Sequence, residues 1–263
     1  MRSDPYPFPR RTAPLPVVFV EQLRLVWDRD KWQLLVLLVL FLNFGQALYY
    51  QGGFATLSTL LILFLAGIWG EMIWRDEETG HLSYGLAMPF QVRNHRLLRV
   101  AAGAVWFLAV FLLGTSSQIA THLSPDPLTR RLLELPAWLV LAWPFALLTV
   151  YLMVSALTIV NGKPSIWAAL IITAIAVMSG LAGAGLMDRI GLSLPGQALR
   201  SLTFGDYGIV TALAPSLFIP DPSLVRHFGY PSPESWNHVL PTMAWFLLAV
   251  ALVVSVAGRH REA

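Results

Sequence analysis

Six stretches of this 263-residue chain are apolar and carry no charged side chain. An α-helix rises about 1.5 Å per residue, so roughly 20 residues cross a hydrocarbon layer of about 30 Å. Hydrophobic residues make up 56% of the chain and charged residues 13%, which is outside the range of soluble globular proteins. The sequence therefore predicts an all-α polytopic membrane protein. The six predicted spans are residues 32–50, 56–70, 100–121, 136–160, 165–187 and 239–257.

Basic residues are distributed unevenly between the two sides of this predicted bundle. With six spans both termini share a side, and that side carries 13 lysines and arginines against five on the other. The richer side is normally cytoplasmic. We therefore expect a multi-pass protein of the bacterial inner membrane, with cytoplasmic termini. Residues 71–99 and the tail, 258–263, then lie in the cytoplasm.

Two longer segments lie outside the predicted spans. Residues 1–31 form an N-terminal segment in which 17–31 has the period of an amphipathic helix. Such a helix can lie in the headgroup layer, although a plain extension of the first span is the alternative. Residues 188–238 lie on the outer side and contain an apolar run, 209–219, that is too short to cross. We expect short re-entrant or interfacial helices there, between the fifth and sixth spans.

The predicted spans lack the side chains that catalysis, metal binding or ion-coupled transport would need. No Asp, Glu, Lys, Arg or His lies in a span centre, and such groups usually mark proton or sodium pathways. The chain has no cysteine and no GxxxxGK[ST] phosphate loop. We therefore expect no enzyme activity, metal or cofactor in this chain. Uphill movement of a solute would need another subunit to supply the energy.

A dense charged segment, residues 71–99, follows the second span. It contains an acidic cluster, a glycine, an amphipathic stretch with an apolar edge, a proline nine residues after the glycine, and then arginines. These residues are Asp76, Glu77, Glu78, Gly80, Leu82, Leu86, Pro89 and Arg93. An apolar edge of this kind can fit a groove on a partner protein. The alternative is a solvated, charge-balanced loop that only sets the topology.

In this motif and in its predicted topology, the chain resembles the membrane subunits of type-2 ABC exporters. That family combines an N-terminal elbow helix, six spans, cytoplasmic termini and an outer re-entrant hairpin before the last span. The resemblance implies that residues 76–89 form a coupling helix, held in a cleft of an ATP-binding subunit. It also implies a second permease subunit, identical or different, and ATP and Mg bound to the partner subunit.

Polar residues inside the spans are candidates for a substrate path. A single residue of this kind more often makes an intramolecular hydrogen bond than a contact with a ligand. They are Asn43, Gln46, Gln118, Thr149 and Ser155. Small residues in the fifth span let helices approach closely, either within one subunit or at a dimer seam. These are the pairs Ser179/Gly183 and Gly180/Ala184.

Together these features predict a membrane domain over residues 32–257, and the resemblance implies that it serves as the permease subunit of an ATP-driven ABC exporter. It would form the substrate path as a dimer and be coupled to separate ATP-binding subunits. The alternative is a non-transporting scaffold or assembly subunit of a larger complex, which the absence of intramembrane charge fits equally well. Membrane lipid is the other expected partner, and no nucleic acid is expected.

Overall fold

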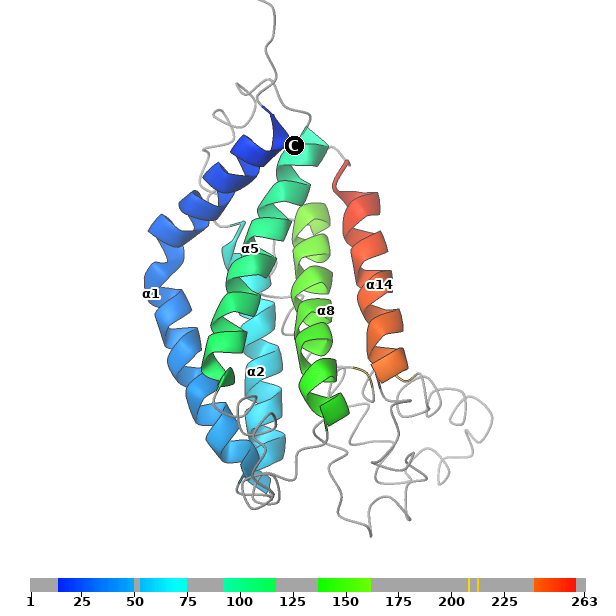
Figure 1. Cartoon of the computed structure of the whole chain (residues 1–263). Coiled ribbons are helices and arrows are strands. Elements are labelled where there is room, and N and C mark those ends of the chain that lie inside the picture. Colours follow the sequence, from blue (N-terminus) through cyan, green and yellow to red (C-terminus); the bar gives the residue numbers. More distant parts are fainter. Residues whose placement is uncertain are drawn as a thin grey trace, which may run out of the picture.

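The computed structural model of the protein describes residues 14–49, 53–74, 92–116, 137–161 and 239–258, together with Gly208 and Ala212. Five helices, labelled as in Figure 1, make up most of this part of the chain. They are α1 (Leu15–Tyr49), α2 (Gly53–Met72), α5 (Val92–Gly114), α8 (Ala137–Asn161) and α14 (Val239–Val256).

The helices lie side by side as an elongated bundle (Figure 1). Helices α1 and α5 run in one direction, and α2, α8 and α14 run in the other (Figure 1). The start of α1 and the end of α14 therefore lie toward the same end of the bundle, which we call the upper end. The end of α2 and the start of α5 also lie toward the upper end.

Three of the described helices contain stretches long and apolar enough to cross a membrane. These are Arg93–Gly114, Ala142–Val160 and Val239–Val256, which correspond to the predicted third, fourth and sixth spans. The all-helical class and the membrane character are thereby confirmed. The count of six spans stays a prediction, and the fifth span, 165–187, lies outside the described residues. So does the predicted outer segment, 188–238, apart from Gly208 and Ala212.

Helix α1 joins two segments that the sequence analysis treated separately, residues 17–31 and the first span, 32–50. It continues from Leu15 to Tyr49 without a break, as a plain extension of the first span would, and a place for residues 17–31 in the headgroup layer stays a prediction. The sequence between Pro16 and Gly45 contains neither proline nor glycine, so nothing interrupts the hydrogen-bond ladder of the helix. The helix bends along its length instead (Figure 1).

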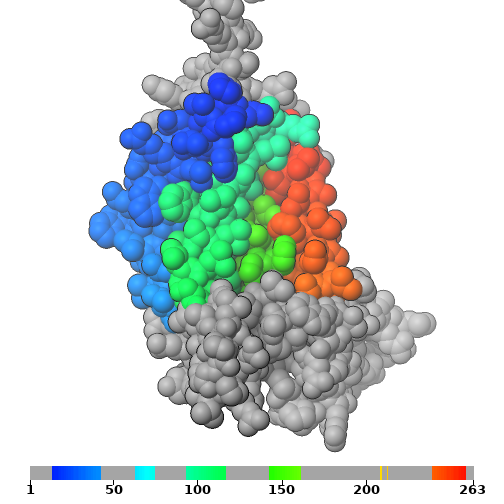
Figure 2. Space-filling model, viewed as in Figure 1, coloured from blue at the N-terminus to red at the C-terminus, as the bar shows by residue number. Residues whose placement is uncertain are grey.

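Helix α8 is the central helix of the described bundle. Within its apolar stretch 72% is buried, against 39% for α5 and 28% for α14. Only a narrow strip of α8 is visible between α5 and α14 in Figure 2. The neighbours of α8 therefore cover most of its surface, whereas α5 and α14 keep a broad apolar face that lipid or another protein chain can cover.

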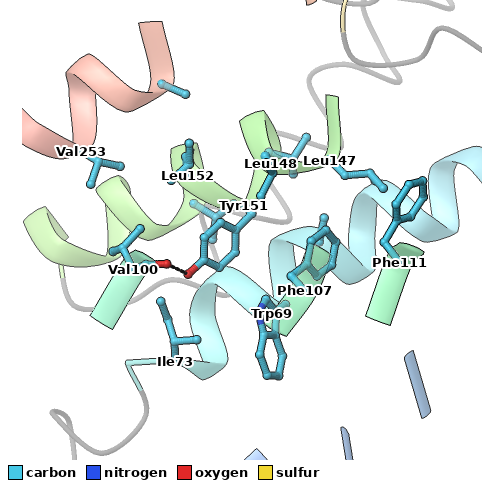
Figure 3. Close-up of a cluster of buried hydrophobic side chains, with 14 of the residues drawn as sticks. Trp69, Ile73, Val100, Phe107, Phe111, Leu147, Leu148, Tyr151, Leu152 and Val253 are labelled. Carbon is cyan, nitrogen blue, oxygen red and sulfur yellow. Dashed lines mark hydrogen bonds between the residues drawn. The ribbon is translucent and has the colours of Figure 1, made fainter. Parts of the chain in front are cut away.

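Aromatic side chains fill the core around Tyr151 on α8 (Figure 3). The Tyr151 hydroxyl donates a hydrogen bond of 2.8 Å to the backbone oxygen of Val100 on α5. The rings of Tyr151 and Phe107 are stacked with centroids 6.2 Å apart. Trp69 on α2 is fully buried and donates a hydrogen bond of 3.0 Å to the backbone oxygen of Gly103. These contacts join α2, α5 and α8 into one packed unit.

Helices α2 and α8 approach closely at Gly70. A Cβ atom added there would lie 2.7 Å from the backbone oxygen of Tyr151, so only glycine fits without a shift. The Ser155 hydroxyl donates a hydrogen bond of 3.4 Å to the backbone oxygen of Gly70. This contact uses a small residue and a hydroxyl, the combination that commonly joins helices inside membranes.

Candidate functional site

The predicted coupling segment, residues 71–99, is described only at its two ends. Residues 71–74 continue from α2, and residues 92–99 form the first turns of α5. The residues predicted to contact a partner lie outside the described part of the chain, except for Arg93. They are Asp76, Glu77, Glu78, Gly80, Leu82, Leu86 and Pro89. The structure therefore describes the two helix ends that border this segment in the sequence.

Arg99 of α5 ties the two ends of the loop together. Its Nε donates a hydrogen bond of 2.6 Å to the backbone oxygen of Ile73, just beyond the end of α2. Its guanidinium carbon also lies 5.7 Å from the centroid of the Trp74 ring, within the range of a cation–π interaction. Ile73 and Trp74 are almost completely buried, so the last described residues before the loop are held firmly.

Arg29 joins α1 to the end of α2. Its Nη2 donates a hydrogen bond of 3.2 Å to the backbone oxygen of Met72, the last residue of α2. Its Nε donates a second hydrogen bond of 2.8 Å to Oδ1 of Asp30, and the two side chains form an ion pair. Asp30 is buried, and the arginine compensates its charge.

Arg96 joins α5 to the end of α14. Its Nη1 lies 3.4 Å from the backbone oxygen of Ala257 in a hydrogen bond, and its side chain is buried. Arg93 passes over the same helix end, since a Cβ atom added to Gly258 would lie 3.7 Å from Arg93 Cδ. The predicted site residue Arg93 thus packs against the last described residue of the chain.

We call Arg29, Arg96 and Arg99 the arginine cluster. The last carbonyl groups of a helix have no partner within the helix and carry a partial negative charge. A cation placed there contributes about 0.3–1 kcal/mol at an exposed site and up to about 2 kcal/mol when partly buried. The three side chains use this interaction at the ends of α2 and α14. Four helices, α1, α2, α5 and α14, are therefore linked beside the loop.

Two tryptophans extend this linkage along α1. The Trp106 indole donates a hydrogen bond of 2.9 Å to the backbone oxygen of Leu23. The Trp106 and Trp27 rings stack with centroids 4.7 Å apart and an interplanar angle of 28°. The N-terminal half of α1 is thus fastened to α5, the helix that begins where the loop ends.

The substrate-path candidates that the structure describes are Thr149 and Ser155 on α8, and both are fully buried. The Thr149 hydroxyl donates a hydrogen bond of 2.7 Å to the backbone oxygen of Phe145, one turn earlier. Ser155 contacts Gly70 in the close approach of α2 and α8. These contacts give both residues a packing role, and a place in a substrate path stays a prediction.

The other path and packing candidates cannot be placed by their side chains. Asn43 and Gln46 belong to the helical backbone of α1, but their side chains lie outside the described residues. Gln118 lies wholly outside the described residues. So do the small residues paired in the predicted fifth span, which are Ser179, Gly180, Gly183 and Ala184.

The arginine cluster joins helices by hydrogen bonds, and Arg29 in it also forms an ion pair with Asp30. Among the described residues, no group of three or more His, Asp or Glu side chains could hold a metal ion. The arginines donate to backbone oxygens and to Asp30. Such an arrangement can transmit a displacement of the loop to four helices at once.

The sequence reasoning missed the arginine cluster. It treated Arg29 only as a charge that sets the topology, and it treated Arg96 and Arg99 as topology charges and as part of the basic segment that follows the predicted coupling motif. One available signal was the spacing of Arg96 and Arg99, which puts both on one face of the helix after the loop. Their partners, the carbonyls at the ends of α2 and α14, are distant in sequence and carry no side-chain signal.

Comparison of the chain with protein-family models, with curated proteins and with solved structures finds no match.

Proposed function

We propose that this chain is the permease subunit of an ATP-driven ABC exporter. In this proposal residues 76–89 form the coupling helix that contacts a separate ATP-binding subunit. ATP and Mg bind to that partner, and a second permease subunit completes the substrate path. The membrane is the bacterial inner membrane, and the upper end of the bundle, with both termini, faces the cytoplasm.

The observation that carries the proposal is the anchoring of the loop base by the arginine cluster. A loop that only sets topology needs no rigid attachment, because any solvated connection would serve. Here Arg29 holds Met72, the last residue of α2, and Arg99 holds Ile73, the residue after it, by hydrogen bonds to their backbone oxygens. A force applied to the loop therefore reaches α1, α2 and α5 directly, which is what coupling to an ATPase requires.

The burial pattern leaves apolar faces that a second membrane subunit can cover. α14 is only 28% buried in its apolar stretch, and α1 exposes large apolar side chains along its length. Examples on α1 are Leu35, Val36 and Val39, each about half exposed. Lipid and a second permease subunit can share these faces.

The proposal is tested by purifying the chain from native membranes in mild detergent. We expect an ATP-binding protein to co-purify, and we expect the complex to hydrolyse ATP in proteoliposomes. A stable complex that contains no ATP-binding protein would favour a scaffold subunit and contradict the proposal.

A further inference from the structure

Asp30 of α1 is a carboxylate that is buried near the end of the charged part of this helix. Its side chain is 5% exposed, and Lys31 is the last charged residue before an uncharged run that reaches to Glu71. A carboxylate removed from water needs a cation and hydrogen bonds to compensate its charge. Arg29 supplies both, although neighbouring residues on a helix do not normally face each other. The arginine side chain therefore bends back toward its own helix.

The contact between these two side chains is bidentate. Arg29 Nε donates a hydrogen bond of 2.8 Å to Asp30 Oδ1, and Nη2 donates to Oδ2. The same Nη2 donates a hydrogen bond of 3.2 Å to the backbone oxygen of Met72, the last residue of α2. A planar guanidinium that is held at two points has a fixed orientation. Asp30 therefore determines where Nη2 lies, and Met72 accepts from a donor that is already in place.

The two partners of this ion pair are unequally buried. The Arg29 side chain is 24% exposed, against 5% for Asp30. A long arginine stem can carry its charged end to water, whereas the short aspartate side chain cannot. Without the carboxylate, water would compete with Met72 for the guanidinium. Replacing a buried ion pair by apolar side chains often leaves stability unchanged, so the orientation of Arg29 is a better reason for this pair than stability.

The bond from Arg29 to Met72 lies beside a gap in the packing of α1 against α2. A cavity of about 290 Å³ lies between the two helices and is lined by Trp32 and Val36 of α1 and by Ile68 and Met72 of α2. Met72 thus both lines the cavity and accepts the bond. Because side chains fill this space incompletely, packing alone leaves room for α1 to shift against α2. A directed bond at the edge of the gap restricts that shift.

We propose that Asp30 is a positioning residue of the junction between α1 and α2. Its carboxylate holds the Arg29 guanidinium on the backbone oxygen of Met72, so α1 follows a displacement of the end of α2. Asp30 acts through Arg29 and does not itself contact a partner protein. The use of this junction in coupling rests on the proposed exporter function, whereas the positioning role does not.

The experiment measures the distance between two spin labels in the purified full-length chain by pulsed electron paramagnetic resonance. The chain has no cysteine, so Leu25→Cys on α1 and Phe64→Cys on α2 provide the two labelling sites. These positions are 55% and 40% exposed and lie one turn before Arg29 and about two turns before Met72. We expect a narrow distance distribution in this chain and a broader one after Asp30→Asn, because the amide has one oxygen and sets an NH₂ group against the guanidinium. An unchanged distribution would overturn the proposal.

Asp28→Asn is the matched control, since it is the same substitution two residues earlier on α1. The Asp28 side chain is 63% exposed, and its Oδ2 lies 3.6 Å from Arg24 Nε. We expect the distance distribution of this variant to equal that of the chain with both aspartates. Equal broadening by Asp28→Asn and Asp30→Asn would overturn the proposal.

A double variant separates positioning from stability. Arg29→Met with Asp30→Leu replaces the ion pair by apolar side chains. We expect a denaturant midpoint close to that of the unmodified chain together with the broad distance distribution of Asp30→Asn. A narrow distribution in the double variant, whatever its midpoint, would overturn the proposal.

The distance measurement contains no ATP-binding subunit, so its outcome does not depend on the exporter proposal. Asp30→Asn is also compared with Asp28→Asn for stimulation of the partner's ATPase, and we expect stimulation to fall only in Asp30→Asn. If Asp30→Asn broadens the distribution but leaves stimulation unchanged, the positioning role stands and the use of the junction in coupling is contradicted.

Discussion

Arg99 and Ile73 lie 26 positions apart in the sequence and are joined by a hydrogen bond of 2.6 Å from the guanidinium to the backbone oxygen. The bond joins the two described segments that border residues 75–91 in the sequence. Because Ile73 is fully buried, the bond fixes both borders of this segment to the core of the bundle. The residues that border this segment are thus held by contacts within the chain and need no partner protein.

Arg99→Met keeps much of the apolar stem and removes the donor to Ile73. We expect the variant to insert and assemble, but to lose most stimulation of the partner's ATPase. Loss of a hydrogen bond to a charged group costs about 1.5–3 kcal/mol of stability, less where water can replace it. ATP hydrolysis and thermal unfolding in the same detergent check the two effects.

The control for this prediction is Arg24→Met, which breaks the ion pair of Arg24 with Asp28. Both of those side chains are more than half exposed, so the pair contributes little to stability. We expect Arg24→Met to behave like the unmodified chain. If Arg99→Met also supported full ATPase stimulation, the arginine cluster would have no part in coupling.

Gly70→Ala should destabilise the packing of α2 against α8. The added methyl group would lie 2.7 Å from the backbone oxygen of Tyr151, and a backbone atom cannot move aside alone. Overpacking of this kind typically costs about 1–3 kcal/mol. Gly258→Ala is the matched control, because its nearest contact would be an ordinary 3.7 Å. Equal midpoints for both variants in denaturant unfolding would contradict this view of the α2–α8 contact.

Gly103→Ala and Tyr151→Phe should show a non-additive effect on stability. A Cβ atom at position 103 would collide with the Tyr151 hydroxyl, whereas the ring carbon that carries it is 3.3 Å away. Tyr151→Phe alone loses the hydrogen bond to Val100, which inside membranes costs about 0.6 kcal/mol on average. We expect the double variant to be more stable than the sum of the single changes predicts. A double-variant cycle of unfolding free energies measures this, and strict additivity would contradict it.

The sequence predicted the membrane class because long uncharged apolar runs have few alternatives to a transmembrane helix. It placed three spans where the described helices contain membrane-crossing stretches, such as Val239–Val256. It could not decide whether residues 17–31 continue the helix of the first span, because the change from amphipathic to uniformly apolar composition near Lys31 does not by itself mark a helix end. The sequence could not predict contacts such as the hydrogen bond between Arg96 and the backbone oxygen of Ala257, because every residue carries a backbone oxygen and none is marked by its type.

Two substitutions within the loop test its role without changing a span. Glu78→Lys reverses a charge on the proposed contact surface, and Gly80→Pro removes a backbone donor and restricts the turn. We expect normal expression and insertion, with a sharp loss of complex formation or of ATPase stimulation. Asp126→Lys in the predicted outer loop is the charge-reversal control and should have far less effect. Normal assembly and ATPase stimulation in both loop variants would favour the charge-balanced topology loop.

The most direct test of the exporter proposal uses the absence of cysteine from this chain. Glu78→Cys and Asp126→Cys each introduce a single thiol, one in the proposed coupling helix and one in the predicted outer loop. A reagent that links a thiol to a nearby lysine is then applied to membranes that contain the co-purifying ATP-binding subunit. The account predicts an adduct with that subunit from position 78 and none from position 126. No adduct from an accessible thiol at position 78, or equal adducts from both positions, would contradict it.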